Sequence, residues 1–283
     1  MGFLEAIFLG LVQGLTEFLP VSSSGHLALV QKLFGMKDVP LMFDVLLHFG
    51  TLFAVFAAFW KDILAMLLEF GRMVSSLFGR SDSKKMPLAR RLVMLIIVGT
   101  LPLVLTVFLS GIVKQAMQTP LAVGLLLCAT GLLLYMANRL PRGEKNEKNA
   151  LVSDALIVGV CQGIAVLPGL SRSGVTISAG LFRKFDRSFA VRFSFLLSVP
   201  AVLGATLLSL IGALRTPEVV ENAPVYMDIA PGFYVVGMIV AALVGYIAIG
   251  LVRRLIGRGK FGGFAFYCLG LGLIAVIVSV IPS

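Results

Sequence analysis

Long apolar stretches alternate with short polar and basic segments along most of the chain. A helix needs about 17–25 residues to cross the roughly 30 Å hydrocarbon layer of a membrane, and six apolar stretches reach or approach that length. The pattern therefore predicts six transmembrane helices: Leu41–Trp60, Leu92–Val113, Leu121–Met136, Phe189–Leu214, Pro231–Leu251 and Phe264–Ile281. The stretch Lys61–Gly79 is also apolar, but its charged residues predict an amphipathic helix at the membrane surface.

The composition agrees with a membrane protein. Hydrophobic residues make up 58% of the chain and charged residues 13%, whereas a soluble domain carries about 25% charged residues. The net charge of +10 comes from basic residues between the apolar stretches, which the positive-inside rule explains without a nucleic-acid partner. The 3 cysteines lie in apolar stretches at spacings unlike those of metal sites, so we predict that they are small buried hydrophobic residues.

The distribution of Lys and Arg predicts the orientation of the chain. Placing the basic segments on the cytoplasmic side lets the six predicted helices alternate, with both termini on the outer side. Ala150–Phe182 then begins and ends on the cytoplasmic side, and Met1–Pro40 begins and ends on the outer side. We therefore predict an all-α integral membrane protein with six transmembrane helices and two re-entrant helix–loop–helix hairpins in an inverted-topology repeat. The basic segments are Lys61–Arg91, Arg139–Lys148, Arg183–Arg192 and Arg253–Lys260.

The second half of the chain contains a diverged copy of the first. LEAIFLGLVQG (Leu4–Gly14) aligns with SDALIVGVCQG (Ser153–Gly163), and the same spacing aligns the serine-rich segments that follow. This repeat predicts a single membrane domain over residues 1–283, with one repeat at about 1–137 and the other at about 150–283. The recurring residues are Ala6, Gly10, Gln13, Gly14, Ser22, Ser24 and Gly25, matched by Ala155, Gly159, Gln162, Gly163, Ser171, Ser173 and Gly174.

Polar residues interrupt the apolar pattern at one place in each copy. The first copy has QGLTEFLPVSSSGH (Gln13–His26), which contains Glu17, and the second has LPGLSRSGVT (Leu167–Thr176), which contains Arg172. Polar groups are costly at membrane depth, and broken helices are tolerated there only inside protein or beside a watery cavity. Each segment leads from a proline through serine and glycine into a new helix, whose N–H groups bind phosphate well. We therefore predict that the two loops meet and form an anion site, suited to phosphate, in a lipid-accessible pocket.

These two segments resemble the two signature segments of the bacterial undecaprenyl-diphosphatase family, which is linked to bacitracin resistance. FDVLLHFGTLFAV (Phe43–Val55) and FSFLLSVPA (Phe193–Ala201) resemble that family as well. The resemblance implies a phosphatase of the bacterial cytoplasmic (inner) membrane that converts undecaprenyl diphosphate to undecaprenyl phosphate and inorganic phosphate. Such an enzyme recycles the carrier lipid of cell-wall synthesis. The resemblance also implies a site open to the outer face of that membrane and a divalent cation, Mg²⁺ or Ca²⁺.

The first family segment opens with Glu or Gln, and here it opens with Gln13. Glu17 is therefore the only carboxylate in the segment, which disfavours a metal site made of paired carboxylates. Glu17 and Gln13 are the candidate metal ligands.

The candidate catalytic residues are Glu17, Ser23, Ser24, His26 and Arg172. We expect Arg172 to clamp the diphosphate, because a planar guanidinium matches phosphate oxygens; an ion pair with Glu17 is the structural alternative. Glu17 has three candidate roles: ligand of the cation, base for water, or partner that orients His26. His26 is a candidate nucleophile or acid–base group, and Ser23 or Ser24 is the rival nucleophile.

Further polar residues have supporting roles in this hypothesis. Ser22 and Ser171 occupy equivalent positions before the new helices, and we expect them to cap those helices. Asp44 and His48 lie one turn apart in the next predicted helix, where they either support the site or form a local pair. Besides Arg172, the expected phosphate ligands are Ser171, Ser173, Thr176, Gly25 and Gly174.

Two other functions fit an anion site between broken helices. Inverted repeats of this kind occur in transporters, so a flippase or transporter of polyprenyl phosphate lipids is the alternative. A binding protein for anionic lipids is the third reading. The cluster of acid, hydroxyls and imidazole favours an enzyme, because carriage alone requires none of them. The expected partners are a polyprenyl diphosphate lipid and membrane lipids, without nucleic acid, and both a monomer and a homodimer remain open.

Overall fold

A computed structural model describes residues 2–36, 39–76, 86–109, 120–215 and 230–280. These residues form helices, turns and one isolated bridge between Lys145 and Phe185, so the all-α prediction is confirmed for this part of the chain. The helices are α1 (Phe3–Phe18), α2 (Ser23–Leu33), α3 (Leu41–Ala58), α4 (Trp60–Ser76), α5 (Leu88–Thr100), the 3₁₀ helix η1 (Leu101–Leu109), α7 (Pro120–Asn138), α8 (Val152–Ile164), α9 (Arg172–Phe182), α10 (Arg187–Arg215), α11 (Pro231–Gly257) and α12 (Gly262–Val280).

The long helices have the length and hydropathy of membrane spans. Among the described residues, α7, α10, α11 and α12 each qualify alone, and α3 with α4 would count as a fifth span across a 90° bend. The chain is therefore a multi-pass membrane protein. The predicted span Leu92–Val113 is divided between α5 and η1, and its last residues lie outside the described part of the chain. The count of six spans stays a prediction.

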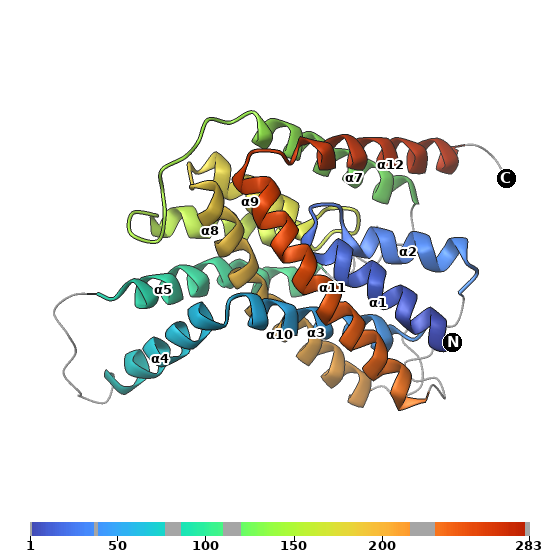
Figure 1. Cartoon of the computed structure of the whole chain (residues 1–283), viewed down its shortest axis with the longest axis horizontal. Coiled ribbons are helices and arrows are strands. Elements are labelled where there is room, and N and C mark those ends of the chain that lie inside the picture. Colours follow the sequence, from blue (N-terminus) through green and yellow to red (C-terminus); the bar gives the residue numbers. More distant parts are fainter. Residues whose placement is uncertain (1, 37–38, 77–85, 110–119, 216–229, 281–283) are drawn as a thin grey trace.

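Two pairs of short helices correspond to the predicted hairpins. In the first pair α1 ends at Phe18 and α2 begins at Ser23; in the second, α8 ends at Ile164 and α9 begins at Arg172. A proline lies in each break, where it cannot continue the preceding helix. Figure 1 shows α1 and α2 towards one end of the molecule and α8 towards the other, with the connecting loops between them.

Side chains and glycines join the two loops directly. The Ser173 hydroxyl donates a hydrogen bond to the Leu19 carbonyl at 3.2 Å. A methyl group added at Gly174 would lie 3.2 Å from Cβ of Pro20, and one added at Gly25 would lie 3.9 Å from Cα of Gly169. Because the loops touch, residues of both copies of the repeat can reach one site.

Each broken pair packs against a helix of the other half of the chain. Helix α1 lies on α11, and a Cβ at Gly10 would be 2.7 Å from the Gly237 carbonyl oxygen. Helix α8 lies on α5, where a Cβ at Gly159 would overlap the Gly99 backbone. Helices α7 and α12, the corresponding last helices of the two halves, pack along each other. Small residues permit such close helix contacts where lipid supplies no hydrophobic driving force.

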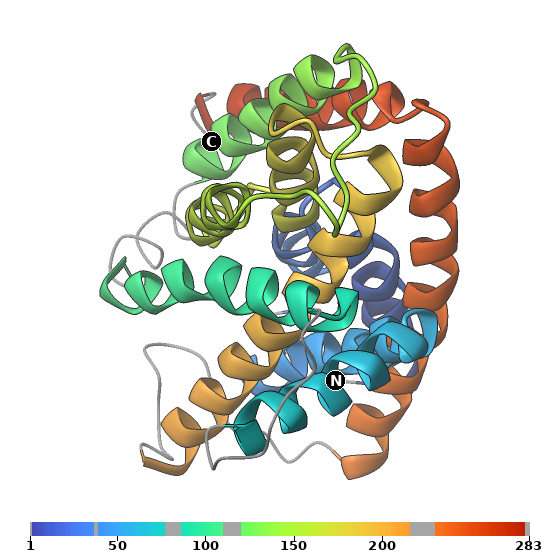
Figure 2. The ribbon, with the colours of Figure 1, turned by 90° about the vertical axis from the view of Figure 1, so that its left-hand side faces the viewer.

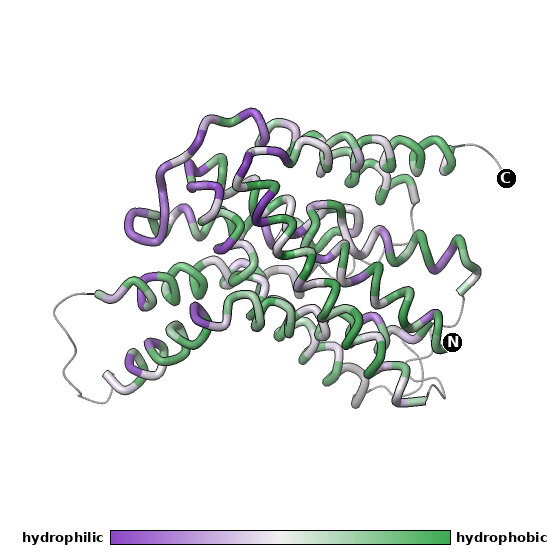
Figure 3. Tube along the Cα trace, viewed as in Figure 1, coloured by the Kyte–Doolittle hydropathy of each residue, from purple (hydrophilic) through white to green (hydrophobic). Residues whose placement is uncertain are grey.

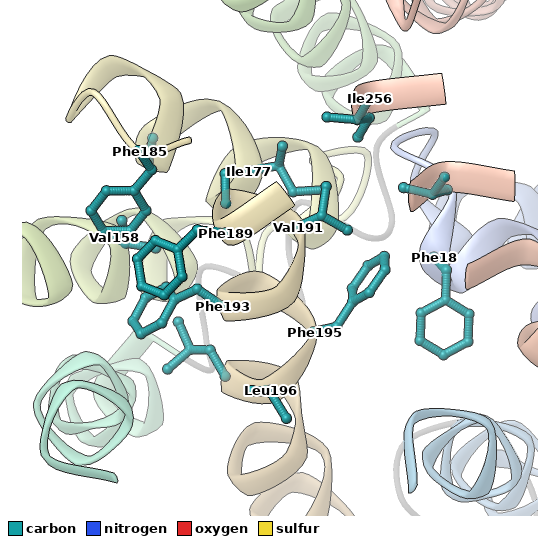
Figure 4. Close-up of a cluster of buried hydrophobic side chains, with 14 of the residues drawn as sticks. Phe18, Val158, Ile177, Phe185, Phe189, Val191, Phe193, Phe195, Leu196 and Ile256 are labelled. Atoms are coloured by element: carbon teal, nitrogen blue, oxygen red, sulfur yellow. The ribbon is translucent and has the colours of Figure 1, made fainter. Parts of the chain in front are cut away.

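Aromatic rings fill the core beside the first loop. Phe18 at the end of α1 meets Phe195 of α10 edge to face, with ring centroids 5.4 Å apart (Figure 4). This contact fixes the C-terminal turn of α1 against α10, immediately beside the Glu17 side chain. A second group of rings in the same core contains Phe185, Phe189 and Phe193.

Polar residues gather at one end of the molecule. Figure 3 shows the hydrophilic colour concentrated on the linker between α7 and α8 and on the turn between α9 and α10, and Figure 2 views this end. The start of α1 and the end of α12 both lie towards the opposite end, apart from each other (Figures 1 and 2). The linker joins the halves where the sequence predicts the connection, after α7 ends at Asn138.

Candidate active site

A polar cavity lies between the two loops. Its volume is about 180 Å³, and α3 contributes to its wall together with both broken pairs. Among the described residues it is lined by Thr16, Glu17, Ser23, Ser24, His48, Ala165, Val166, Leu170, Ser171 and Arg172. The structure therefore brings together the predicted acid, two serines and the arginine.

Glu17 is the centre of this cavity. Its side chain is only 5% exposed, and its Oε1 accepts a charge-assisted hydrogen bond from Nη2 of Arg172. Its Oε2 accepts hydrogen bonds from the Ser23 hydroxyl at 2.7 Å and from Nε2 of Gln13 at 2.9 Å. The ion pair that the sequence left as an alternative is present, and Arg172 nevertheless lines the cavity.

The sequence left open whether His48 supports the site or forms a local pair with Asp44. Nε2 of His48 lies 3.6 Å from Oε2 of Glu17, and Nδ1 of the same ring hydrogen-bonds to the Asp44 carbonyl at 2.8 Å. The Asp44 carboxylate accepts from Nε2 of Gln31 instead, so the two side chains do not form the local pair considered above. The helical spacing placed them on one face, but only the packing of α3 shows that His48 faces the cavity.

His26 lies outside the lining of the cavity. Its Nδ1 is 2.8 Å from the Ser22 carbonyl, and its Nε2 is 2.6 Å from the hydroxyl of Tyr267 on α12. Both ring nitrogens thus have partners away from Glu17. The sequence gives no signal for Tyr267, because it lies in a distant apolar helix. The proposed nucleophilic role of His26 stays a prediction.

The serines at the two helix starts behave differently. The Ser171 hydroxyl accepts from the Gly174 N–H at 3.1 Å, so its predicted cap is confirmed. The predicted cap by Ser22 is wrong: its side chain makes no capping hydrogen bond, and its backbone has φ 71° and ψ 95°. The Ser22 carbonyl, like that of Ser171, accepts the first backbone hydrogen bond of the following helix.

Two expected phosphate ligands hydrogen-bond to protein atoms. The Ser173 hydroxyl donates to the Leu19 carbonyl, and the Thr176 hydroxyl contacts the Arg172 carbonyl at 2.8 Å and the Ser194 hydroxyl at 2.6 Å. Neither residue lines the cavity, and neither do Gly25 and Gly174. Of the expected phosphate ligands, the structure places Ser171 and Arg172 at the cavity.

The residues present suit a cation that takes most of its ligands from substrate. Within the described residues no group of three or more His, Cys, Asp or Glu side chains has the geometry of a metal site. Glu17 offers one carboxylate, and the buried Oε1 of Gln13 has no hydrogen-bond partner. Mg²⁺ is held by such sites, with one or two carboxylates plus substrate phosphates and water.

Fold and site together define a multi-pass helical membrane protein with a polar cavity between its two broken helix pairs. The family model described as bacitracin resistance protein BacA matches residues 6–274, and this chain belongs to that family. A protein of Methanosphaera stadtmanae named undecaprenyl-diphosphatase is 40% identical over 286 residues, covering 99% of each chain. A protein of Desulfosudis oleivorans with the same name is 43% identical over 274 residues, covering 95% of this chain and 96% of the other.

Proposed function

We propose that this protein is a membrane phosphatase that hydrolyses undecaprenyl diphosphate to undecaprenyl phosphate and inorganic phosphate. The observation that carries the proposal is that Glu17, Ser23 and Arg172 contact one another at one polar cavity. The names of the relatives support the same reaction. The enzyme would thereby recycle the carrier lipid of cell-wall synthesis.

Arg172 binds the terminal phosphate in this proposal. Its guanidinium now contacts Glu17, and a diphosphate entering the cavity takes over part of that contact. Helices α2 and α9 begin at Ser23 and Arg172, so their N-terminal ends add favourable potential for the anion. When the diphosphate binds, the Arg172 guanidinium therefore contacts the substrate in place of the carboxylate. Glu17 is then free to accept a proton.

Ser23 is the nucleophile that the geometry favours. Its oxygen bonds to the terminal phosphorus while the bond from phosphorus to the bridging oxygen breaks, and undecaprenyl phosphate leaves. The hydroxyl proton passes to Oε2 of Glu17, which already accepts it in a hydrogen bond of 2.7 Å. Water then attacks the phosphoserine and releases phosphate, and the proton returns from Glu17 to Ser23.

A divalent cation fits the same site. Glu17 and Gln13 would hold it, and when bound it would neutralise charge on the phosphate oxygens. His48, 3.6 Å from Glu17, borders this position and keeps the carboxylate in place.

We also propose the predicted topology: six spans and two re-entrant hairpins in one domain of two inverted repeats, in the bacterial cytoplasmic membrane. The reciprocal packing of α1 on α11 and of α8 on α5 supports the repeat, because an approximate two-fold relation generates both contacts together. The polar linker end would face the cytoplasm and both termini the outer side. The site would then open towards the outer face.

Transport of polyprenyl phosphate lipids is less well supported. The relatives are named as diphosphatases, and the hydrogen bond from Ser23 to Glu17 has no function in carriage.

The test is phosphate release from a polyprenyl diphosphate by the purified protein. We expect wild-type turnover, and loss of turnover in Glu17→Ala and Ser23→Ala variants that elute as folded protein. A matched Ser279→Ala variant on α12, far from the cavity in sequence and outside its lining, should retain wild-type activity. Lipid transport without phosphate release would contradict the proposal.

A further inference from the structure

The residue before the proposed nucleophile has an unusual backbone. Ser22 has φ 71°, a left-handed conformation that residues with a Cβ rarely adopt, and Ser23 follows it directly. Such conformations persist only where the surrounding structure holds them. Among the described residues the buried Ser22 hydroxyl has no hydrogen-bond partner, so the side chain of Ser22 does not stabilise this backbone conformation.

His26, one turn further along α2, stabilises the backbone conformation of Ser22. The Ser22 carbonyl accepts hydrogen bonds from the backbone N–H of His26 at 3.2 Å and from its ring Nδ1 at 2.8 Å. A carbonyl can only accept, so Nδ1 carries the proton and Nε2 of the neutral ring is an acceptor. The imidazole is therefore fixed in one tautomer by its contact with the backbone.

Tyr267 completes the chain of contacts. Its hydroxyl lies 2.6 Å from Nε2 of His26 and, since Nε2 accepts, the tyrosine donates. The two rings are also stacked, with centroids 5.6 Å apart and planes at 14°. Helix α12 thus holds the His26 ring by a hydrogen bond and by ring contact.

The second copy of the repeat keeps the backbone hydrogen bond, from the Val175 N–H to the Ser171 carbonyl at 2.8 Å, but lacks the ring contacts. Val175 replaces His26 there, and Ser171 has an ordinary φ of −85°. Its hydroxyl caps α9, and its N–H donates to the Thr130 hydroxyl at 3.1 Å. The left-handed serine and the His–Tyr pair therefore occur together, in the copy whose next residue is the proposed nucleophile, Ser23.

We infer that Tyr267 and His26 are positioning residues that hold the backbone of Ser22 and so present the Ser23 hydroxyl to Glu17. The inference rests on the proposed function for its catalytic consequence. It assigns His26 no proton transfer with substrate, because both of its nitrogens are engaged outside the cavity.

The first test removes only the tyrosine hydroxyl. In Tyr267→Phe we expect kcat for polyprenyl diphosphate to fall about 3- to 10-fold, the effect of one lost hydrogen bond. KM should change less than about twofold, because Tyr267 does not line the cavity. Tyr246→Phe is the matched control, since Tyr246 is exposed to a similar extent (53% against 49%) and should keep wild-type kcat.

A double-mutant cycle tests whether the effect passes through Ser22. Glycine adopts a positive φ without strain, and Ser22→Gly removes a hydroxyl that has no partner. In the Ser22→Gly background Tyr267→Phe should therefore reduce kcat less than twofold. An undiminished loss in that background, or wild-type kcat in Tyr267→Phe, would overturn the inference.

A pair of His26 variants separates positioning from acid–base chemistry. Asparagine places a side-chain N–H near the position of Nδ1, so His26→Asn should keep the bond to Ser22 and retain activity within about tenfold. His26→Val copies the second repeat and should lose about 10- to 100-fold more than the asparagine variant. Equal losses in the two variants would show that the imidazole acts in the chemistry.

Hydrogen exchange distinguishes failure of this inference from failure of the proposed function. Faster exchange of the amides of residues 22–26 in Tyr267→Phe, but not in Tyr246→Phe, is expected whether or not the protein releases phosphate. A wild-type protein without phosphatase activity would contradict the proposed function alone, and unchanged exchange would contradict the positioning contact.

Discussion

Glu17 shows how a charge is kept inside an apolar protein. A buried carboxylate costs several kcal/mol unless partners compensate it, and here Arg172, Ser23 and Gln13 contact its two oxygens. The loop sequences predict that the acid and the arginine meet. They do not predict His48 or Tyr267 beside the loops, because the rotation of α3 and the position of α12 depend on packing across the whole chain.

The Arg172→Lys variant separates charge from shape. Lysine still neutralises Glu17, so the protein should fold, but it lacks the planar fork that contacts two phosphate oxygens. We expect kcat/KM to fall about 10- to 100-fold, as for loss of a hydrogen bond to a charged group. Equal thermal melting with reduced phosphate release would meet this expectation, and wild-type kcat/KM would remove Arg172 from substrate binding.

The nucleophile can be identified by its chemistry. Rapid acid quench during turnover of labelled polyprenyl diphosphate should give an acid-stable phosphate ester on Ser23, because its hydroxyl donates to Glu17. A phosphoramidate on His26 would be lost in acid and recovered in base. Label on Ser24, or on His26 after a base quench, would contradict the assignment to Ser23.

At the scale of elements, proline and serine predict the helix breaks but not their geometry. The breaks lie where the sequence places them, yet Ser22 has a left-handed backbone and its side chain makes no capping hydrogen bond to α2. The 90° bend between α3 and α4 follows a change in composition at Trp60 and Lys61, but no residue there specifies the angle. Contacts between distant segments decide both features.

Gly10 lies where α1 crosses α11, and we expect that no larger residue is tolerated at this position. Gly10→Ala would bring a methyl group to 2.7 Å from the Gly237 carbonyl, so the thermal midpoint in detergent should fall. Gly250→Ala is the matched control, because Gly250 lies in α11 with open space around it. That variant should be unchanged or more stable by about 0.4–1 kcal/mol. Equal midpoints for Gly10→Ala and wild type would disprove the close crossing.

Asp154 connects the linker between α7 and α8 to both α8 and α9 through hydrogen bonds. At the polar end of α8 it is fully buried and accepts from Lys145 Nζ at 2.7 Å, Arg183 Nε at 2.8 Å and the Leu151 N–H at 2.9 Å. Burial raises the pKa of Asp154, but the hydrogen bonds from Lys145, Leu151 and Arg183 outweigh it and hold the pKa below its usual value.

A pH-dependent contribution to stability follows from that lowered pKa. The ionised Asp154 stabilises the fold fully above its unfolded pKa of about 3.9, and this contribution is lost as the pH falls through the lower folded pKa. Asp154→Asn should therefore lower the thermal midpoint at pH 7, and the difference from wild type should shrink below about pH 4. A difference of equal size at pH 7 and pH 3 would contradict the ion-pair account.

For the whole molecule, the sequence predicts an all-helical membrane protein, and the described helices agree; the two related halves stay a prediction. Hydropathy alone does not settle the number of spans, because α5 changes to a 3₁₀ helix beside Pro102 and α4 turns away from α3. Charge bias predicts the orientation, and the linker lies at the end of the molecule opposite the start of α1 and the end of α12.

Labelling of single cysteines tests that orientation. With Cys128, Cys161 and Cys268 replaced by alanine, an impermeant maleimide should label Leu4→Cys in intact cells and Lys148→Cys only after permeabilisation. Both positions are exposed, so access depends on the side of the membrane. The opposite pattern would invert the topology, with the site facing the cytoplasm.

The reciprocal packing of the halves has a consequence for biosynthesis. A ribosome that has released only α1 to α7 has made a first hairpin whose partner helix, α11, is not yet synthesised. Glu17 and the proposed nucleophile therefore wait for Arg172, in the second half of the chain, and for α11, which lies in its last quarter. A truncated or stalled chain would carry no assembled catalytic centre, and fragments cut in the linker would regain one only when produced together.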